Sequence, residues 1–142
     1  MSLAVWLYFF GHKEPPEMYR TLPYTTQAVV NIDGKYPEIR IKTVDDIWDQ
    51  VEKLCEENKK FSDGNNKFTD GQNLYHQIPL FADPDKLVSS WMWDMINEYN
   101  YVKRFNISLG ELDNVSAHRL DCFSIIDKEI MACQKFEQSK NG

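Results

Sequence analysis

A chain of 142 residues is long enough for one domain with a sizeable hydrophobic core, and we expect a single domain over residues 1–142. Its formal net charge of −6 argues against a nucleic-acid-binding protein, because phosphate contacts require clustered Lys and Arg side chains. The charge leaves open a protein that imitates a polyanion or binds a basic partner.

The first apolar segment, residues 3–10 (LAVWLYFF), is too short for a membrane helix, which needs about 20 apolar residues. It also lacks the basic flank and the small-residue cleavage site of a signal peptide. Apolar side chains on both faces favour a strand that is covered on both sides, so we expect residues 3–10 to form a buried strand. Prolines make residues 12–23 a loop.

Residues 27–42 carry the pattern of a β-hairpin. Asp33-Gly34 favours a two-residue turn, because both residue types tolerate the positive φ angles that such a turn requires. This turn predicts pairing of Ile32 with Lys35, Val30 with Pro37 and Ala28 with Ile39, which places most apolar side chains on one face. With residues 3–10 beside it, the hairpin would form a three-stranded antiparallel sheet.

An amphipathic helix is predicted over residues 43–60. Thr43 and Asp46 have the spacing of a capping box at its start. Apolar residues then recur every three or four positions, and the opposite face is acidic. We expect Trp48 on the apolar stripe to be buried against Ile39 and Ile41 of the hairpin. The acidic face predicts either a solvated surface or a surface that meets a basic partner.

Residues 61–82 contain two Asp-Gly pairs and several Asn residues, which predict an exposed connection. Calcium binding is not supported there, because Phe68 and Leu74 occupy the Gly and Glu positions of an EF-hand loop that starts at Asp63. Asp83-Pro84 then predicts the start of a helix that runs to about Arg104. Residues 108–115 suggest one helical turn or a tight loop, and a last helix is predicted from about residue 116 to 137.

The sequence contains no motif for a metal, a cofactor or a catalytic nucleophile. Its three histidines and three cysteines lack the spacing of a metal site, and the odd number of cysteines without a CxxC pair favours reduced thiols in a cytoplasmic protein. Acidic and apolar neighbours of Cys122 are expected to raise the pKa of its thiol. The best acid–base candidate is His118 with Asp121, three residues apart on one helix.

Two aromatic residues lie outside the main apolar stripe of the helix after Asp83. Trp93 and Tyr101 are eight residues apart, with Asn97 and Asn100 along the same row. Large rings surrounded by amides are typical of protein interfaces, in which the aromatics exclude water and the amides form hydrogen bonds. We therefore predict that Trp93, Asn97, Asn100 and Tyr101 contact another protein or a second copy of this chain.

The pattern as a whole predicts an α+β fold, with a small antiparallel sheet (an N-terminal strand plus hairpin 27–42) packed with about three main helices. The predicted function is a non-catalytic interaction or assembly module, without membrane insertion, cofactor or metal. An acidic inhibitor or DNA mimic is one alternative, and a small enzyme that uses His118 and Asp121 is another. Small size, acidity and the absence of a catalytic motif are also common among phage accessory proteins, although no motif identifies one here.

Overall fold

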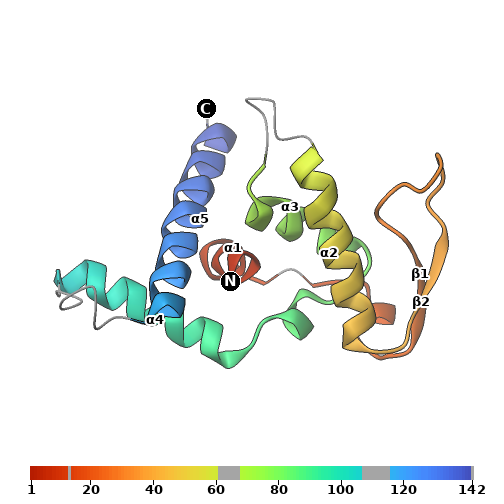
Figure 1. Cartoon of the computed structure of the whole chain (residues 1–142), viewed down its shortest axis with the longest axis horizontal. Coiled ribbons are helices and arrows are strands. Elements are labelled where there is room, and N and C mark those ends of the chain that lie inside the picture. The colour runs from red at the N-terminus through yellow and green to blue at the C-terminus, as the bar shows by residue number, and fades with distance from the viewer. Residues whose placement is uncertain (13, 61–67, 107–115, 142) are drawn as a thin grey trace.

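The computed structural model describes residues 1–12, 14–60, 68–106 and 116–141. These residues form a mostly helical α+β fold, with five α-helices and one two-stranded antiparallel sheet, which confirms the predicted class (Figure 1). Two of the predicted segments lie outside the described residues: the turn at 108–115 and the start of the connection, at 61–67. The elements are α1 (Ser2–Phe10), η1 (Glu17–Tyr19), β1 (Tyr24–Gln27), β2 (Glu38–Ile41), α2 (Val44–Lys60), α3 (Asp70–Gln77), η2 (Ile78–Leu80), η3 (Pro84–Leu87), α4 (Ser90–Phe105) and α5 (Ala117–Asn141).

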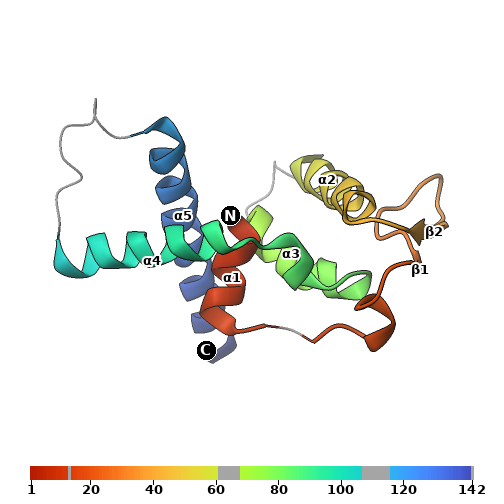
Figure 2. The same cartoon turned by 90° about the horizontal axis from the view of Figure 1, so that it is seen from below.

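Helix α1 is the centre of the fold, and the prediction of a strand over residues 3–10 is wrong. Residues from Leu3 to Leu7 are all buried, and α1 packs against α3 and α5 (Figures 1 and 2). A short, wholly apolar segment is equally compatible with a helix that is covered on several sides and with a strand that is covered on both faces. The helix ends where the Gly11 N–H donates to the Leu7 carbonyl oxygen at 2.8 Å, with Gly11 at a φ of 90°.

Trp6 of α1 is fully buried and joins three helices. Its ring centroid lies 5.7 Å from that of Tyr75 in α3 and 5.7 Å from that of Phe136 in α5. The Trp6 indole N–H donates to the Glu129 carboxylate at 3.0 Å. The Trp6 side chain therefore buries apolar area between the helices and also forms a hydrogen bond with α5.

Glu129 of α5 is 2 % exposed and accepts hydrogen bonds from three directions. Besides Trp6, the Thr69 hydroxyl donates to it at 2.5 Å and the Gly71 N–H donates at 3.1 Å, both at the start of α3. Gly71 is required by space: a Cβ atom there would lie 2.5 Å from Trp6 Cδ1 and 2.6 Å from Glu129 Oε1. This buried carboxylate ties α1, α3 and α5 together, and it satisfies a backbone donor at the α3 N-terminus.

The predicted hairpin turn is confirmed, whereas the register of its strands differs. Asp33 and Gly34 have φ angles of 51° and 81°, and Ile32 and Lys35 form a bridge across them. Further along, however, Thr26 rather than Ala28 stands opposite Ile39. Between the two, residues 29–31 stand opposite residue 36 alone, since Ala28 already bonds to residue 37. This bulge shifts the register by two positions, which keeps the side chains of β1 and β2 on the faces that the turn predicts.

Helix α2 begins as predicted, but Trp48 is not buried. The Asp46 carboxylate accepts the Thr43 N–H at 3.1 Å and the Lys42 N–H at 2.8 Å, and these two backbone hydrogen bonds lower the pKa of Asp46. Ile47 is fully buried, whereas 43 % of Trp48 is exposed. The side of α2 that faces the core is already occupied by Ile47, Val51 and Leu54. Trp48 lies beside this buried stripe, so its ring stays partly exposed at the edge of the core.

Residues 68–82 are not the exposed connection that the turn residues predict. They form α3 and η2, and their buried side chains include Leu74, Ile78 and Phe81. Asp83 does cap the next turn by accepting the Asp85 N–H, but that turn is the short η3, and α4 begins only at Ser90. No helix among the described residues combines the length and the apolar character that crossing a membrane requires.

Candidate functional site

The four residues predicted to contact a partner lie along one flank of α4. Asn97 is exposed and Tyr101 is 59 % exposed, whereas Trp93 and Asn100 are partly buried. Trp93 packs against the edge of the hydrophobic core, so it is not the fully exposed indole that its position off the apolar stripe suggests. The flank thus has an anchored end at Trp93 and an open end at Tyr101.

The C-terminal end of α1 lies against the same flank. Asn100 Nδ2 donates to the Tyr8 hydroxyl at 3.0 Å, and Tyr8 is itself 50 % exposed. The His12 ring, just after α1, lies 5.7 Å from the Trp93 ring between centroids. We call the set of Tyr8, His12, Trp93, Asn97, Asn100 and Tyr101 the α1–α4 surface.

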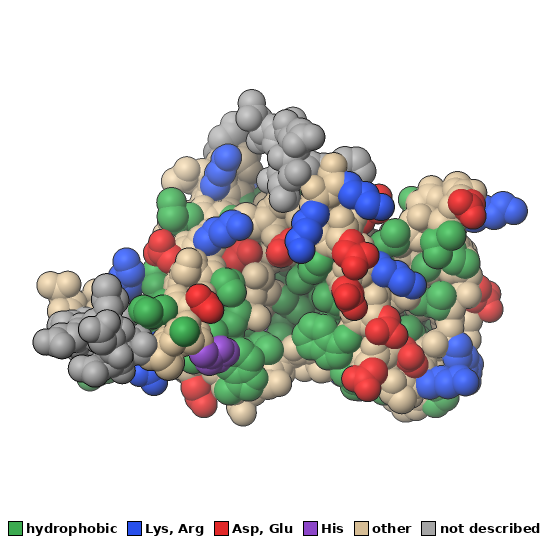
Figure 3. All heavy atoms as spheres, viewed as in Figure 1, with side chains coloured by type: hydrophobic (Ala, Val, Ile, Leu, Met, Phe, Trp, Pro, Cys, Tyr) green, Lys and Arg blue, Asp and Glu red, His purple; other side chains and the backbone are tan. Residues whose placement is uncertain are grey.

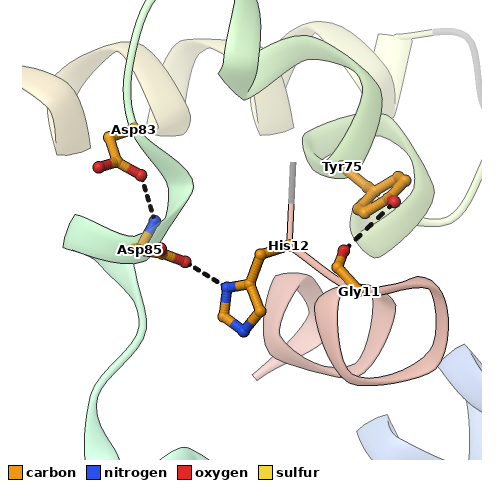
Figure 4. Close-up of polar contacts among 5 residues, drawn as sticks. All are labelled: Gly11, His12, Tyr75, Asp83 and Asp85. Carbon is orange, nitrogen blue, oxygen red and sulfur yellow. Dashed lines mark hydrogen bonds and ion pairs between the residues drawn. The ribbon is translucent and has the colours of Figure 1, made fainter. Parts of the chain in front are cut away.

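Polar contacts fix the segment that carries His12. Figure 4 shows the His12 ring turned toward Asp85, with Nδ1 and Oδ1 2.6 Å apart, and the Tyr75 hydroxyl turned toward the Gly11 carbonyl oxygen at 3.5 Å. Asp85 is itself held by the η3 turn that Asp83 caps. The position of His12 beside Trp93 is therefore set by contacts from two other elements, α3 and η3.

Sequence reasoning missed Tyr8 and His12 as members of this surface. Both belong to a segment that was predicted as a strand and a loop in a different part of the fold. An i, i+4 pattern does relate Tyr8 to His12, but it lies at the end of a segment that is otherwise apolar. Their proximity to Asn100 and Trp93 depends on how α1 crosses α4, which one sequence does not reveal.

The predicted acid–base pair of His118 and Asp121 does not form in the part of the chain that the structure describes. His118 Nε2 lies 3.6 Å from Cys122 Sγ, and the His118 ring lies 5.5 Å from that of Trp91. Burial raises the pKa of the Cys122 thiol, as the sequence predicts, which makes it a poor nucleophile. The described residues also contain no group of three His, Cys, Asp or Glu side chains placed to hold a metal ion.

Comparison with known proteins gives no match to a family model, to a curated protein or to a solved structure. The function must therefore be inferred from the geometry of this chain. What the α1–α4 surface offers is exposed ring area, amide donors and acceptors, and a fixed imidazole. These groups can bind a partner, and they do not include a nucleophile with an activating base.

Proposed function

We propose that this protein is a non-catalytic interaction module of the cytoplasm, and that it binds another protein through the α1–α4 surface. One observation supports the proposal most: two half-exposed tyrosines from different helices, Tyr8 and Tyr101, flank the amides of Asn97 and Asn100. Tyrosine supplies large contact area at a small entropic cost, and amides adapt their hydrogen bonds to the partner.

The surface is already ordered in the free protein, which favours binding. The hydrogen bond from Asn100 to Tyr8 and the contact of His12 with Trp93 hold these side chains without a partner. Binding of a partner therefore costs less conformational entropy, because these side chains are already held in place. Trp93 would serve as an anchor at one end of the surface, because it is partly buried and packs against the core.

The test is site-specific photo-crosslinking in the host cell. A photoreactive phenylalanine analogue replaces Tyr101 in one protein and Met131 in the matched control, since Met131 of α5 is 63 % exposed and lies outside the surface. The proposal predicts a discrete crosslinked partner from position 101 only. Equal crosslinking at both positions, or none at position 101, would contradict it.

A paired variant separates binding from folding. Asn97 and Tyr101 are both exposed, so Asn97→Ala with Tyr101→Ala should change the free energy of unfolding by less than about 1 kcal/mol. Partner capture by purified protein should nevertheless be lost. Sedimentation of the same variant decides between the two kinds of partner, because a second copy of this chain would show as self-association that the variant abolishes.

The acidic face of α2 supports a second candidate function, an acidic inhibitor or DNA mimic. Asp45, Asp49, Glu52 and Glu56 are exposed and recur at helical spacing along one line, and none of them forms an ion pair with a described residue. Figure 3 shows acidic side chains gathered along α2. Mimicry predicts that the captured partner binds DNA and that duplex DNA displaces it, so capture that is insensitive to duplex DNA excludes this function.

A further inference from the structure

A second surface, far from α4, lies along the hairpin. An open groove of about 580 Å³ follows strand β1, between the hairpin and the segments η1 and η2. We call it the hairpin groove; its walls include Tyr19, Thr25, Gln27, Tyr36, Glu38 and Leu80. Both Thr25 and Gln27 belong to β1, so the groove runs beside the strand itself.

The backbone of β1 presents free hydrogen-bonding positions on this side. The Ala28 N–H donates to the Pro37 carbonyl oxygen at 2.8 Å, and in an antiparallel pair such bonded positions alternate with non-bonded ones. Thr26 therefore directs its backbone groups toward β2, whereas Thr25 and Gln27 direct theirs away from it. No further strand pairs with that edge among the described residues.

The two edges of the sheet differ in their protection against pairing. The outer edge of β2 carries the charged residues Glu38 and Arg40. Charges on an edge strand disfavour the addition of another chain. By contrast, β1 has the sequence Tyr-Thr-Thr-Gln and carries no charge, and Pro23 directly precedes it as Pro37 precedes β2. The edge beside the groove therefore lacks the charges that protect the other edge.

We propose that the outer edge of β1 docks an extended peptide from a partner protein, which adds a third strand to the sheet and alternates apolar with polar side chains. Alternate side chains of an added strand point to opposite faces of the sheet. Gln27, Glu38 and Arg40 share one face of the sheet, and on that face Arg40 donates to Thr25 Oγ1 at 3.1 Å. Polar side chains of the peptide would lie on that face.

The other face of the groove is suited to apolar side chains. The Tyr19 hydroxyl lies 3.1 Å from Thr26 Oγ1, which places the Tyr19 ring on the face opposite Gln27. The Tyr24 hydroxyl, on that same face, donates to the Phe81 carbonyl oxygen, so η2 with Leu80 lies on this side too. Leu80 is 61 % exposed, which leaves it available to an apolar side chain of the peptide.

The experiment titrates the protein with an acetylated and amidated six-residue peptide of alternating Val and Lys. Backbone amide resonances are followed by NMR, together with their hydrogen exchange. Binding at the edge predicts shifts and slowed exchange at Thr25 and Gln27. The same peptide with alternate N-methylated amides should bind at least about tenfold more weakly, because the added strand pairs through its backbone N–H groups.

Two matched variants test the edge on the protein side. Thr25 and Arg40 stand opposite each other, and Arg40 donates to Thr25 Oγ1 at 3.1 Å, so proline at either position removes the same side-chain contact. Thr25→Pro blocks the proposed edge and should weaken binding at least about tenfold, whereas Arg40→Pro blocks the opposite edge and should change it less than about twofold.

Three results would overturn the proposal: no resonance change with the Val and Lys peptide, equal binding of the N-methylated peptide, or equal loss in the two proline variants. Self-association through Thr25 and Gln27 at rising protein concentration would instead assign the edge to a second copy of this chain. The peptide comparisons use the unmodified protein, so they decide the outcome even if Thr25→Pro fails to fold.

Discussion

Replacing Glu129 with Gln tests whether the buried carboxylate holds α1, α3 and α5 together. The substitution keeps the shape of the side chain but replaces one acceptor oxygen with an NH2 group. One oxygen of Glu129 serves Trp6 and Thr69 and the other serves Gly71, so Gln cannot accept all three hydrogen bonds. With the amide oxygen retained toward Trp6, its NH2 group faces the Gly71 N–H, and two donors then oppose each other.

The expected cost follows from the contacts that are lost. A hydrogen bond to a charged group contributes about 1.5–3 kcal/mol, and a buried donor left without an acceptor costs about 1–3 kcal/mol. Both ranges count part of the same lost hydrogen bond, so they are not simply added. We therefore expect Glu129→Gln to lower the free energy of unfolding by about 2–4 kcal/mol. At roughly 3 °C per kcal/mol for a chain of this size, the melting temperature should fall by about 6–12 °C.

The assay is urea unfolding followed by tryptophan fluorescence, with Glu137→Gln as the matched control. Glu137 lies on the same helix and is exposed, so its substitution should change stability by less than about 0.5 kcal/mol. Gly71→Ala should be destabilising as well, because its Cβ would collide with Trp6 and Glu129. If Glu129→Gln is as stable as Glu137→Gln, the carboxylate does not hold the three helices, and this reasoning is refuted.

Four further predictions concern the rest of the fold. Gly34→Val should cost more than about 1 kcal/mol in urea unfolding, because a β-branched residue is strained at a φ of 81°; an unchanged midpoint would contradict the turn. Trp48→Ala should cost less than Ile47→Ala, because Trp48 is 43 % exposed and Ile47 is fully buried; the reverse order in urea unfolding would place Trp48 in the core. Burial raises the pKa of Cys133 from 9.0 to about 12 and that of Tyr24 from 10.0 to about 12. The neutral forms of these two side chains therefore stabilise the fold fully below pH 9, and this stabilisation is lost as the pH rises toward 12. A urea midpoint that stays constant from pH 8 to 11.5 would contradict this prediction. Metal analysis of the purified protein should find no stoichiometric zinc, because its histidines and cysteines lack ligand spacing.

Local signals in the sequence predict local structure well here. The turn at Asp33-Gly34, the start of α2 at Thr43 and the cap at Asp83 all depend on backbone angles or hydrogen bonds within four residues. Such features need no knowledge of the rest of the chain. The register of the strands could not be predicted in this way, because the bulge at residues 29–31 moves it by two positions without changing which side chains of β1 and β2 share a face.

The identity of α1 could not be decided in the same way. Its residues are apolar in every direction, so neither a period of 2 nor one of 3.6 stands out. What selects the helix is its surroundings, because α3 and α5 cover it and Trp6 reaches the Glu129 carboxylate. Glu129 illustrates the same limit, since its three donors come from Trp6, Thr69 and Gly71, which are distant from it in sequence.

The four residues of the predicted site do lie in a row on α4, but the residues that neighbour them were not predicted. Helical spacing alone places Trp93, Asn97 and Tyr101 on one flank, and the structure keeps them there. Exposure is a tertiary property, however, so the pattern could not show that Trp93 lies against the core or that Tyr8 contacts Asn100.

The two proposed binding surfaces can act independently because of where the fold places them. Both views of the chain show α4 and the hairpin at opposite ends of its long axis, with α1 and α3 between them (Figures 1 and 2). They also differ in chemistry: the α1–α4 surface offers side chains fixed on helices, whereas the edge of β1 offers backbone groups to an extended peptide. A protein bound at one end would leave the other end accessible. Simultaneous occupation would make this small chain a connector between two proteins, a role that needs two separate surfaces and no catalytic group.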